Sequence, residues 1–210
     1  TGFKIDTNGD GTLESFDADQ KAVVTDAAGK PIGELVIRID GSFTFTPAKD
    51  YFGPVPVATY SITDGNGGTD SATLTLGPVI NTADTPLGAD VTKTTAEDTP
   101  YTVKAVDFGF SDVDGDTLAA VRIDTLPTNG KLTLNGVVVT VGQEISVAGI
   151  NSGKLLFVPD ANENGAPYGN FTFSVKDTTG LFDTVPNTFT LNVTPVNDKP
   201  DAVDDVKVVA

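Results

Sequence analysis

The chain contains no cysteine, histidine, methionine or tryptophan. Without cysteine, disulfides cannot hold the fold, and thiol catalysis and thiolate-metal sites are excluded. Without histidine, the usual general base and the usual zinc ligand are missing, which leaves metals that prefer oxygen ligands, such as calcium. No run of about 18 apolar residues occurs, so we expect no membrane insertion. Because the chain begins at Thr1, we expect an excised piece of a longer protein, with any targeting signal outside it.

Basic residues are also scarce, with 13 Lys and Arg against 29 Asp and Glu, a formal charge of -16 and a pI near 4.1. Binding to phosphate needs an excess of Lys and Arg, so nucleic acid and anionic membranes are not expected partners. Of the 29 acidic residues, 24 are aspartate, which favours turns and calcium loops over helices. The 12 Phe and 4 Tyr provide for a packed core.

Apolar residues alternate with threonine and serine in short runs, a pattern typical of half-buried β-strands. The clearest runs are 42–46, 59–63, 73–76, 171–175 and 189–193. Gly, Asn and Asp turn signals separate such runs at the spacing of an antiparallel sandwich. The sequence therefore predicts an all-β fold of Greek-key, immunoglobulin-like β-sandwiches.

Several segments of the first half recur in the second. The matching pairs are 45–47 with 157–159, 60–64 with 173–177, and 86–96 with 200–210. The last pair defines a period of 114 residues, which predicts tandem sandwiches in an elongated arrangement, each contacting mainly its neighbours. We expect an N-terminally incomplete sandwich at 1–80, a complete one at 81–198, and a linker with the first strand of a third at 199–210.

A short acidic turn of the form Asp-x-[Asp/Asn]-Gly-Asp occurs in both halves. Its oxygen-bearing residues are Asp6, Asn8 and Asp10 in the first copy, and Asp112, Asp114 and Asp116 in the second. Carboxylates at alternate positions repel one another unless a hard cation lies among them, and calcium is the expected ion. We interpret the two turns as the same element of successive sandwiches.

A rival interpretation of the first turn is an EF-hand or dockerin loop, because Asp17 stands at the twelfth position counted from Asp6. Such a loop needs a helix after it, and no amphipathic helix is predicted there. The second copy also has Ile123 at the position equivalent to Asp17. The ion is the same in both interpretations, and only its placement differs.

The linker motif 195–200, the acidic Glu97 after the first strand of its unit, and the Asp-x-Asp turn resemble bacterial cadherin-like tandem repeats. Repeats of this family occur in giant secreted adhesins, including the RTX and biofilm-associated kinds. The resemblance implies interdomain calcium (Ca²⁺) as the cofactor. The implied metal ligands are Asp6, Asn8, Asp10, Asp84, Glu97, Asp112, Asp114, Asp116, Asp177, Asn197 and Asp198.

The same resemblance implies how these ligands divide between junctions. Glu97 and Asp112 are expected to serve the junction with the first unit, and Asn197 and Asp198 the following junction. At the first junction the pattern differs, because Ala83 stands where the second copy has asparagine. Asp84 is the remaining linker ligand there, and a looser or calcium-free joint is the alternative.

The expected function is a calcium-rigidified extender of a bacterial surface adhesin, exported by type I secretion and supporting adhesion and biofilm formation. Its partners would be neighbouring repeats and host or biofilm surface ligands. The alternative is a carbohydrate- or protein-binding module, with Tyr51, Phe52 and Tyr168 as loop aromatics, although alternating aromatics more commonly belong to a core. No nucleophile system can be assembled without His and Cys, so we expect no enzyme.

Overall fold

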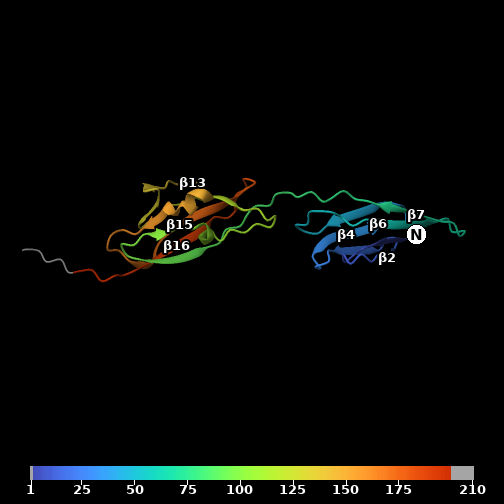
Figure 1. Ribbon diagram of the computed structural model, residues 1–210, viewed down its shortest axis with the longest axis horizontal. Helices are drawn as coiled ribbons and strands as arrows, with labels where there is room; N and C mark the ends of the chain where they lie inside the picture. The colour runs from blue at the N-terminus through green and yellow to red at the C-terminus, as the bar shows by residue number, and fades with distance from the viewer. Residues whose placement is uncertain (1, 200–210) are drawn as a thin grey trace, which may run out of the picture. The chain divides into compact units, whose positions relative to one another are not determined.

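The computed structural model of the chain describes residues 2–199. It divides into two compact units, Thr1–Ala83 (unit 1) and Asp84–Ala210 (unit 2). Nearly all regular structure is β-strand, arranged in each unit as two sheets (Figure 1). The predicted all-β fold of tandem β-sandwiches is therefore confirmed. The expected opening strand of a third unit, within 199–210, lies almost entirely outside the described residues.

Unit 1 contains seven strands in two sheets with the orders β2-β1-β6-β7 and β3-β4-β5. The strands are β1 (Gly2–Ile5), β2 (Glu14–Asp17), β3 (Lys21–Thr25), β4 (Pro31–Ile37), β5 (Phe43–Pro47), β6 (Ala58–Thr63) and β7 (Thr69–Leu74). Alternate residues along a strand point to opposite faces, so Ile5, Val24 and Leu35 are buried between the sheets. These residues belong to the core of unit 1.

Within residues 84–199, unit 2 contains nine strands in sheets with the orders β13-β10-β15-β16-β8 and β12-β11-β14-β9. They are β8 (Val91–Ala96), β9 (Tyr101–Thr102), β10 (Leu118–Ile123), β11 (Lys131–Leu134), β12 (Val137–Val138), β13 (Glu144–Ser146), β14 (Leu155–Val158), β15 (Gly165–Asp177) and β16 (Asn187–Thr194). Three short helical turns are η1 (Ala105–Phe108), α1 (Val147–Gly149) and η2 (Ile150–Lys154). The consecutive strands β14 and β15 lie in different sheets, as Greek-key connections require.

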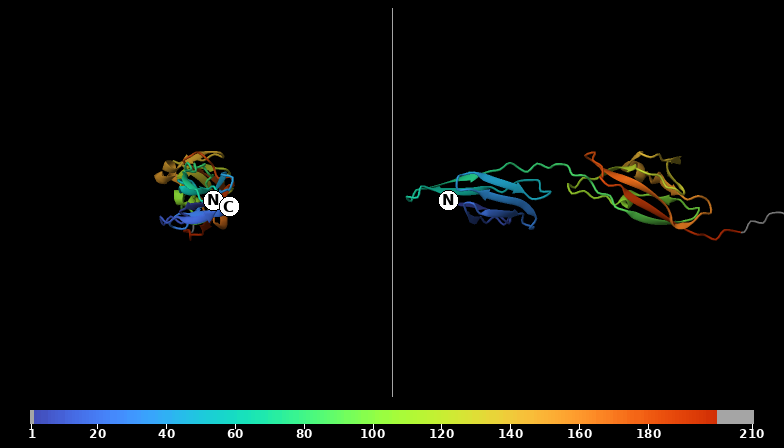
Figure 2. Two further views of the ribbon diagram at one scale, coloured as in Figure 1. Left: turned by 90° about the vertical axis from the view of Figure 1, so that its right-hand side faces the viewer. Right: turned by 180° about the vertical axis from the view of Figure 1, so that it is seen from behind.

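The core of unit 2 is built around phenylalanines at alternate strand positions. Phe171, Phe173 and Phe189 are all fully buried. The rings of Phe171 and Phe189 stack with centroids 4.9 Å apart, and Phe108 from η1 packs edge-on against Phe173 at 4.8 Å. Figure 2 shows the strands around this core from behind. Successive side chains of a strand point to opposite faces of the sheet, so the apolar residues that alternate in the sequence are the ones that face the core.

The loop aromatics considered as a ligand platform belong mainly to the cores. Tyr168 is 6% exposed and packs edge-on against Phe157. Tyr51 packs against the core of unit 1, while Phe52 is 42% exposed. The core interpretation is confirmed for Tyr168. No helix among residues 2–199 has both the length and the apolar character needed to cross a membrane.

The β6-β7 pair of unit 1 corresponds to the β15-β16 pair of unit 2. Gly53, which follows the repeated segment 45–47, forms an antiparallel bridge with Val79. Gly165, which follows the matching segment 157–159, pairs with Val193. Both pairs of strands are antiparallel and carry the repeated segments found in the sequence. Positions in the two units can therefore be compared through this pairing.

The two acidic turns, by contrast, are not the same element, and our interpretation of them was wrong. Strand β1 pairs with β6 as β10 pairs with β15, so β1 and β10 are equivalent. Residues 112–116 precede β10, whereas residues 6–10 follow β1. The motif recurs because an aspartate that accepts bonds from backbone N–H groups two to five residues ahead closes a tight turn in any loop.

Candidate metal centre

Three aspartates gather in the turn that leads into β10. Asp112, Asp114 and Asp116 each offer a carboxylate oxygen, and these oxygens all lie within 4.8 Å of one another. Calcium binds oxygen at about 2.3–2.6 Å, so one ion can reach oxygens at this separation from opposite sides. Acidic groups also cluster on surfaces without an ion, so the case for a metal depends on the surroundings of the turn.

The first of these surroundings is an unpartnered oxygen on Asp112. Its Oδ1 accepts hydrogen bonds from the backbone N–H groups of Asp114, at 2.8 Å, and Asp116, at 3.3 Å. Its Oδ2 is buried and has no hydrogen-bond partner among residues 2–199. A buried carboxylate oxygen without a partner is costly, and a bound cation would compensate it.

Asp177, at the end of β15, repeats this arrangement. It is 1% exposed. Its Oδ1 accepts hydrogen bonds from the Thr179 hydroxyl at 2.8 Å and from the N–H groups of Gly180 and Leu181 at 2.7 and 2.9 Å. Its Oδ2 is the other buried side-chain oxygen left without a partner in the described chain. The buried, unpartnered oxygens of Asp112 and Asp177 therefore favour a bound cation, independently of the clustering of the three aspartates.

The electrostatics keep Asp177 charged. Burial raises the pKa of this carboxyl, but the hydrogen bonds from Thr179, Leu181 and Gly180 together hold the pKa below its ordinary value. Asp177 is therefore an anion at neutral pH. It also belongs to the same end of the unit as the acidic turn, because it lies opposite Leu118 in the β10-β15 ladder and Thr178 donates to Asp116 Oδ1 at 2.8 Å.

Asp84 joins this group through its backbone. Its N–H donates to Asp114 Oδ2 at 2.7 Å. Three residues on, the bridge between Leu87 and Ser111 fixes the incoming chain next to the acidic turn. The structure therefore brings together Asp84, the three aspartates of the turn and Asp177 at the end of unit 2 where the chain arrives from unit 1.

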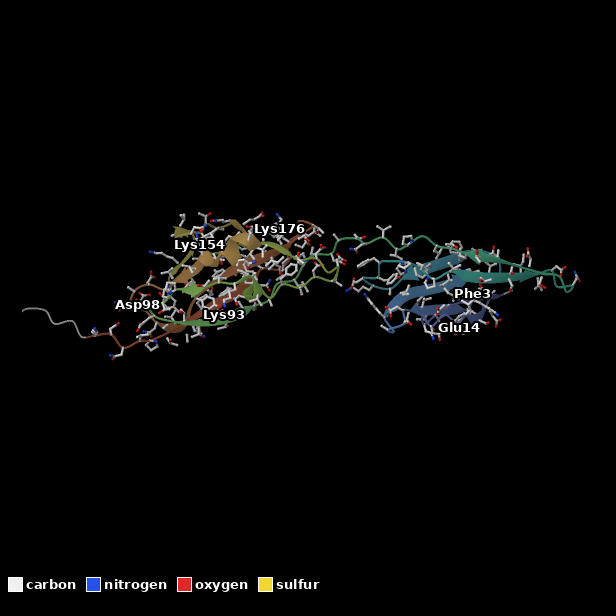
Figure 3. All side chains as sticks on the ribbon, viewed as in Figure 1. Phe3, Glu14, Lys93, Asp98, Lys154 and Lys176 are labelled. Carbon is white, nitrogen blue, oxygen red and sulfur yellow. The ribbon has the colours of Figure 1, made fainter. Side chains whose placement is uncertain are left out.

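Glu97 does not join them, and its assignment to the same junction as Asp112 was wrong. Strand β8 runs parallel to β16, with Ala96 opposite Thr194. Glu97 consequently lies where β16 ends, and its carboxylate accepts hydrogen bonds from the Val196 N–H and, at 3.2 Å, from the Asn164 amide. Figure 3 labels the adjacent Asp98 at this end of unit 2.

The linker residues Asn197 and Asp198 follow β16 directly and so come after the same strand end as Glu97. Asn197 donates its side-chain amide to the Asp198 carbonyl at 3.3 Å. The grouping of Glu97 with Asn164 gave no signal in the sequence, because the contact spans 67 residues and Asn164 belongs to no repeated motif. The eleven predicted ligands thus fall at three separate places.

The third place is the turn at Asp6, Asn8 and Asp10 in unit 1. Asp6 accepts hydrogen bonds from the N–H groups of Asn8, Gly9 and Gly11, at 3.2, 2.7 and 2.9 Å. The bond from Gly11 is the main cause that lowers the pKa of Asp6. Both oxygens are partnered by the turn itself, so this site lacks the unpartnered oxygens seen in unit 2.

The EF-hand interpretation of that turn requires a helix after the loop. The segment that follows is instead the strand β2, which pairs with β1 from Glu14 to Asp17. Thr12 and Asn8 donate to the two oxygens of Asp10 at 2.7 and 3.1 Å, which again closes a local turn. The loop is therefore a connection between two paired strands.

Two family models match the chain, and together they cover most of it. A model described as "Bacterial Ig domain" matches residues 81–194, and one described as "Cadherin-like domain" matches residues 8–77. The first covers more than half of the chain, which therefore belongs to the bacterial Ig domain family. A search of curated proteins found no match.

Among solved structures, the chain is similar to that of human mucin-like protocadherin EC1-2. The two share 18% sequence identity, the match covers 91% of this chain and 94% of the other, and the TM-score is 0.42. Cadherin-like domains generally bind calcium and contact neighbouring repeats, and domains of both classes are typically structural or adhesive, not enzymatic. The family matches indicate an adhesion-related module with an extracellular or surface location.

Proposed function

We propose that this chain is part of the calcium-stiffened extender region of a bacterial cell-surface adhesin, where it supports adhesion and biofilm formation. The observation that carries the proposal is the pair of buried, unpartnered oxygens, Asp112 Oδ2 and Asp177 Oδ2, beside the acidic turn. They lie in the part of unit 2 that holds the incoming chain at Asp84. We also propose repeat boundaries at residues 80 and 198, export by type I secretion, and adhesive ligands on host or biofilm surfaces.

Calcium fits this donor set better than zinc or copper does. Asp112, Asp114, Asp116 and Asp177 supply only oxygen atoms, which hard cations prefer. Zinc and copper favour histidine and cysteine, which the chain lacks. When bound, calcium would neutralise part of the repulsion among these carboxylates. Extracellular calcium modules work at dissociation constants of roughly 10⁻⁴–10⁻³ M, which suits a surface protein.

We expect calcium to stiffen the link between the two units because of the segments that surround the proposed site. The acidic turn precedes β10, Asp177 ends β15, and Asp84 lies on the chain that arrives from unit 1. A link between domains is flexible by default, because interdomain contacts are usually small. An ion that fixes the turn also fixes Asp114, and through it the hydrogen bond to Asp84. Without the ion the carboxylates repel one another and this anchor weakens.

Glu97, Asn197 and Asp198 are proposed to serve the following joint in the same way. Glu97 already holds the chain leaving β16 through Val196. Because β8 and β16 end together, an acidic residue after the first strand is brought beside the outgoing linker. This geometry explains why the two motifs occur together in one unit.

The absence of cysteine makes this proposal directly testable with two spin labels. Nitroxides are attached at Lys49→Cys in unit 1 and Lys154→Cys in unit 2, both exposed positions. Pulsed electron double resonance then measures the distribution of distances between them. We expect a narrow distribution in calcium and a broader one in excess chelator.

The control is the double variant Asp112→Asn/Asp177→Asn, which should give the broad distribution in both buffers. Asp26→Asn removes a charge from an exposed turn in unit 1 and should behave like the parent chain. Equal widths with and without calcium in the parent chain would contradict the proposed function.

A further inference from the structure

The segment that enters unit 2, residues 84–90, makes two contacts at the acidic turn. Asp84 donates to an aspartate of the turn, and Leu87 pairs with Ser111, the residue directly before the turn. Under the proposed function, a bound cation holds the turn in place. Both contacts should therefore loosen when the cation is removed and the carboxylates repel one another.

Gly88, the next residue of this segment, is held from a different loop. Its N–H donates to Asp183 Oδ2 at 2.8 Å. Asp183 lies in the loop between β15 and β16 and is 7% exposed. Ala89 follows, with its N–H donating at 3.1 Å to the carbonyl of the fully buried Phe108. The chain is thus fixed at residues 88 and 89 by groups outside the acidic turn.

Asp183 needs no cation to keep this place. Its Oδ1 accepts the N–H of Val185 at 2.9 Å, and its Oδ2 also accepts the side-chain amide of Asn187 at 2.6 Å. Both oxygens are therefore partnered, whereas Asp112 and Asp177 each leave Oδ2 without a partner. Hydrogen bonds to a carboxylate are stronger than those between neutral groups. The bond from Gly88 should consequently persist without calcium.

The loop that carries Asp183 is itself attached to the sheet. The Asp183 N–H donates to the Val175 carbonyl at 2.9 Å, and Phe182 forms a bridge with Lys176. Two cations lie over the Phe182 ring, with Arg122 at 4.6 Å and Lys176 at 4.9 Å from its centroid. None of these residues is among the predicted metal ligands, so these contacts should hold the loop in place whether or not the turn binds an ion.

The close approach of the chain to this loop requires a glycine at position 88. A Cβ atom built on Gly88 would lie 2.5 Å from Asn187 Nδ2 and 3.2 Å from Asp183 Oδ2. Both distances are shorter than ordinary van der Waals contact. A larger residue at this position would therefore displace either the chain or the side chains that hold it.

We propose that Asp183 is a positioning residue of this joint, which keeps the incoming chain in place from Gly88 onward whether or not calcium is bound. Calcium then controls only the residues before Gly88, and this half of the inference rests on the proposed function. Loss of calcium would free residues 84–87, a stretch that spans at most about 14 Å when fully extended. The joint without calcium is thus a hinge of limited reach and not a long tether.

Amide hydrogen exchange of the full chain, followed by two-dimensional NMR, tests this anchor at the residue it holds. In the parent chain, the Gly88 N–H should exchange at rates that agree within about twofold in calcium and in chelator. Asp183→Ala should accelerate Gly88 exchange by about tenfold or more in both buffers, because the hydrogen bond that protects this N–H is lost. Gly88 exchange that rises on chelation in the parent chain, or that is unchanged by Asp183→Ala, would overturn the proposal.

Asp160→Ala is the matched control, because Asp160 Oδ2 accepts the N–H of another loop glycine, Gly130, at 3.0 Å. It should accelerate exchange at Gly130 and leave Gly88 unchanged. Faster Gly88 exchange in this control would show a general loss of stability and would also overturn the proposal. The amides of β10 and β15, which pair with each other, report whether each variant is folded.

Gly88→Ala tests the same contact with the Asp183 side chain left in place. The added Cβ should push the chain away from Asp183, so the N–H at position 88 should again exchange faster. Slow exchange there would contradict the proposed anchor. The Asp84 N–H tests the proposed function separately in the same spectra. Equal Asp84 exchange in calcium and in chelator would contradict the calcium-dependent contacts and leave the Asp183 anchor standing.

Discussion

Replacing Asp177 by asparagine separates the charge of this side chain from its hydrogen bonds. Asp177 Oδ1 accepts three hydrogen bonds from Thr179, Gly180 and Leu181, and an asparagine amide oxygen can accept the same three. The unpartnered Oδ2 becomes an NH₂ group and the negative charge is lost. The turn after β15 is thus preserved while the proposed calcium ligand is removed.

Without calcium, the substitution should be neutral or stabilising. A buried polar atom without a partner costs about 1–3 kcal/mol, and more when charged. Removing the charge of Asp177 relieves part of this cost and its repulsion with the acidic turn. For a domain of this size, 1 kcal/mol corresponds to roughly 3–4 °C in the unfolding midpoint. The variant should therefore unfold at the same temperature as the parent or up to about 10 °C higher in chelator.

With calcium, the parent chain should have a higher unfolding midpoint than the Asp177→Asn variant. At a calcium concentration a hundredfold above its dissociation constant, the parent chain gains about 2.7 kcal/mol, or roughly 8–10 °C. The variant has lost a ligand and should gain less than about half of this. Thermal unfolding followed by near-ultraviolet circular dichroism measures the difference in midpoint between the parent and the variant, once in calcium and once in chelator.

Asp107→Asn is the matched control, because Asp107 is also buried but both its oxygens are partnered, by Lys93, Lys104 and Tyr101. It should lower the midpoint by the same amount in both buffers. If Asp177→Asn behaved like this control, with equal destabilisation in calcium and chelator, the argument from the unpartnered oxygen would be refuted.

Two further predictions concern the cores. Burial and the hydrogen bond to Asp107 raise the pKa of Tyr101 to about 12. Because the folded state keeps this proton longer than the unfolded chain, the associated stability is present below about pH 10 and lost as the pH rises toward 12. An ultraviolet titration should show one tyrosinate forming last, and Tyr101→Phe should remove that step; an unchanged titration would contradict the assignment. Phe171→Ala removes a fully buried ring stacked on Phe189 and should cost about 3–5 kcal/mol in urea unfolding, whereas Phe43→Ala, at a position 48% exposed, should cost clearly less. Equal losses of unfolding free energy for Phe171→Ala and Phe43→Ala would contradict the conclusion that Phe171 is fully buried while Phe43 is half exposed.

Local patterns in the sequence predicted the fold well, because a strand's period of two is a local property. The alternating Phe171 and Phe173 are both buried. The same pattern at Phe43 and Phe45 predicted a strand correctly, although Phe43 is half exposed. Alternation shows which face of a strand is apolar, but whether another strand covers that face depends on the rest of the sheet.

The candidate site was less predictable, because it depends on contacts far apart in the sequence. The parallel pairing of β8 with β16 carries Glu97 to the end opposite the one we assigned. The similarity of the two acidic turns reflects shared turn chemistry, and only strand pairing reveals that one follows its strand and the other precedes it. Asp112 and Asp114 were recognisable because their spacing is itself local.

Calorimetric titration of calcium into the metal-free full chain tests the central claim most directly. We predict a saturable binding event that is lost or weakened by about tenfold or more in Asp112→Asn/Asp177→Asn and unchanged in Asp26→Asn. Identical binding curves for all three chains would contradict the claim that these buried carboxylates bind calcium.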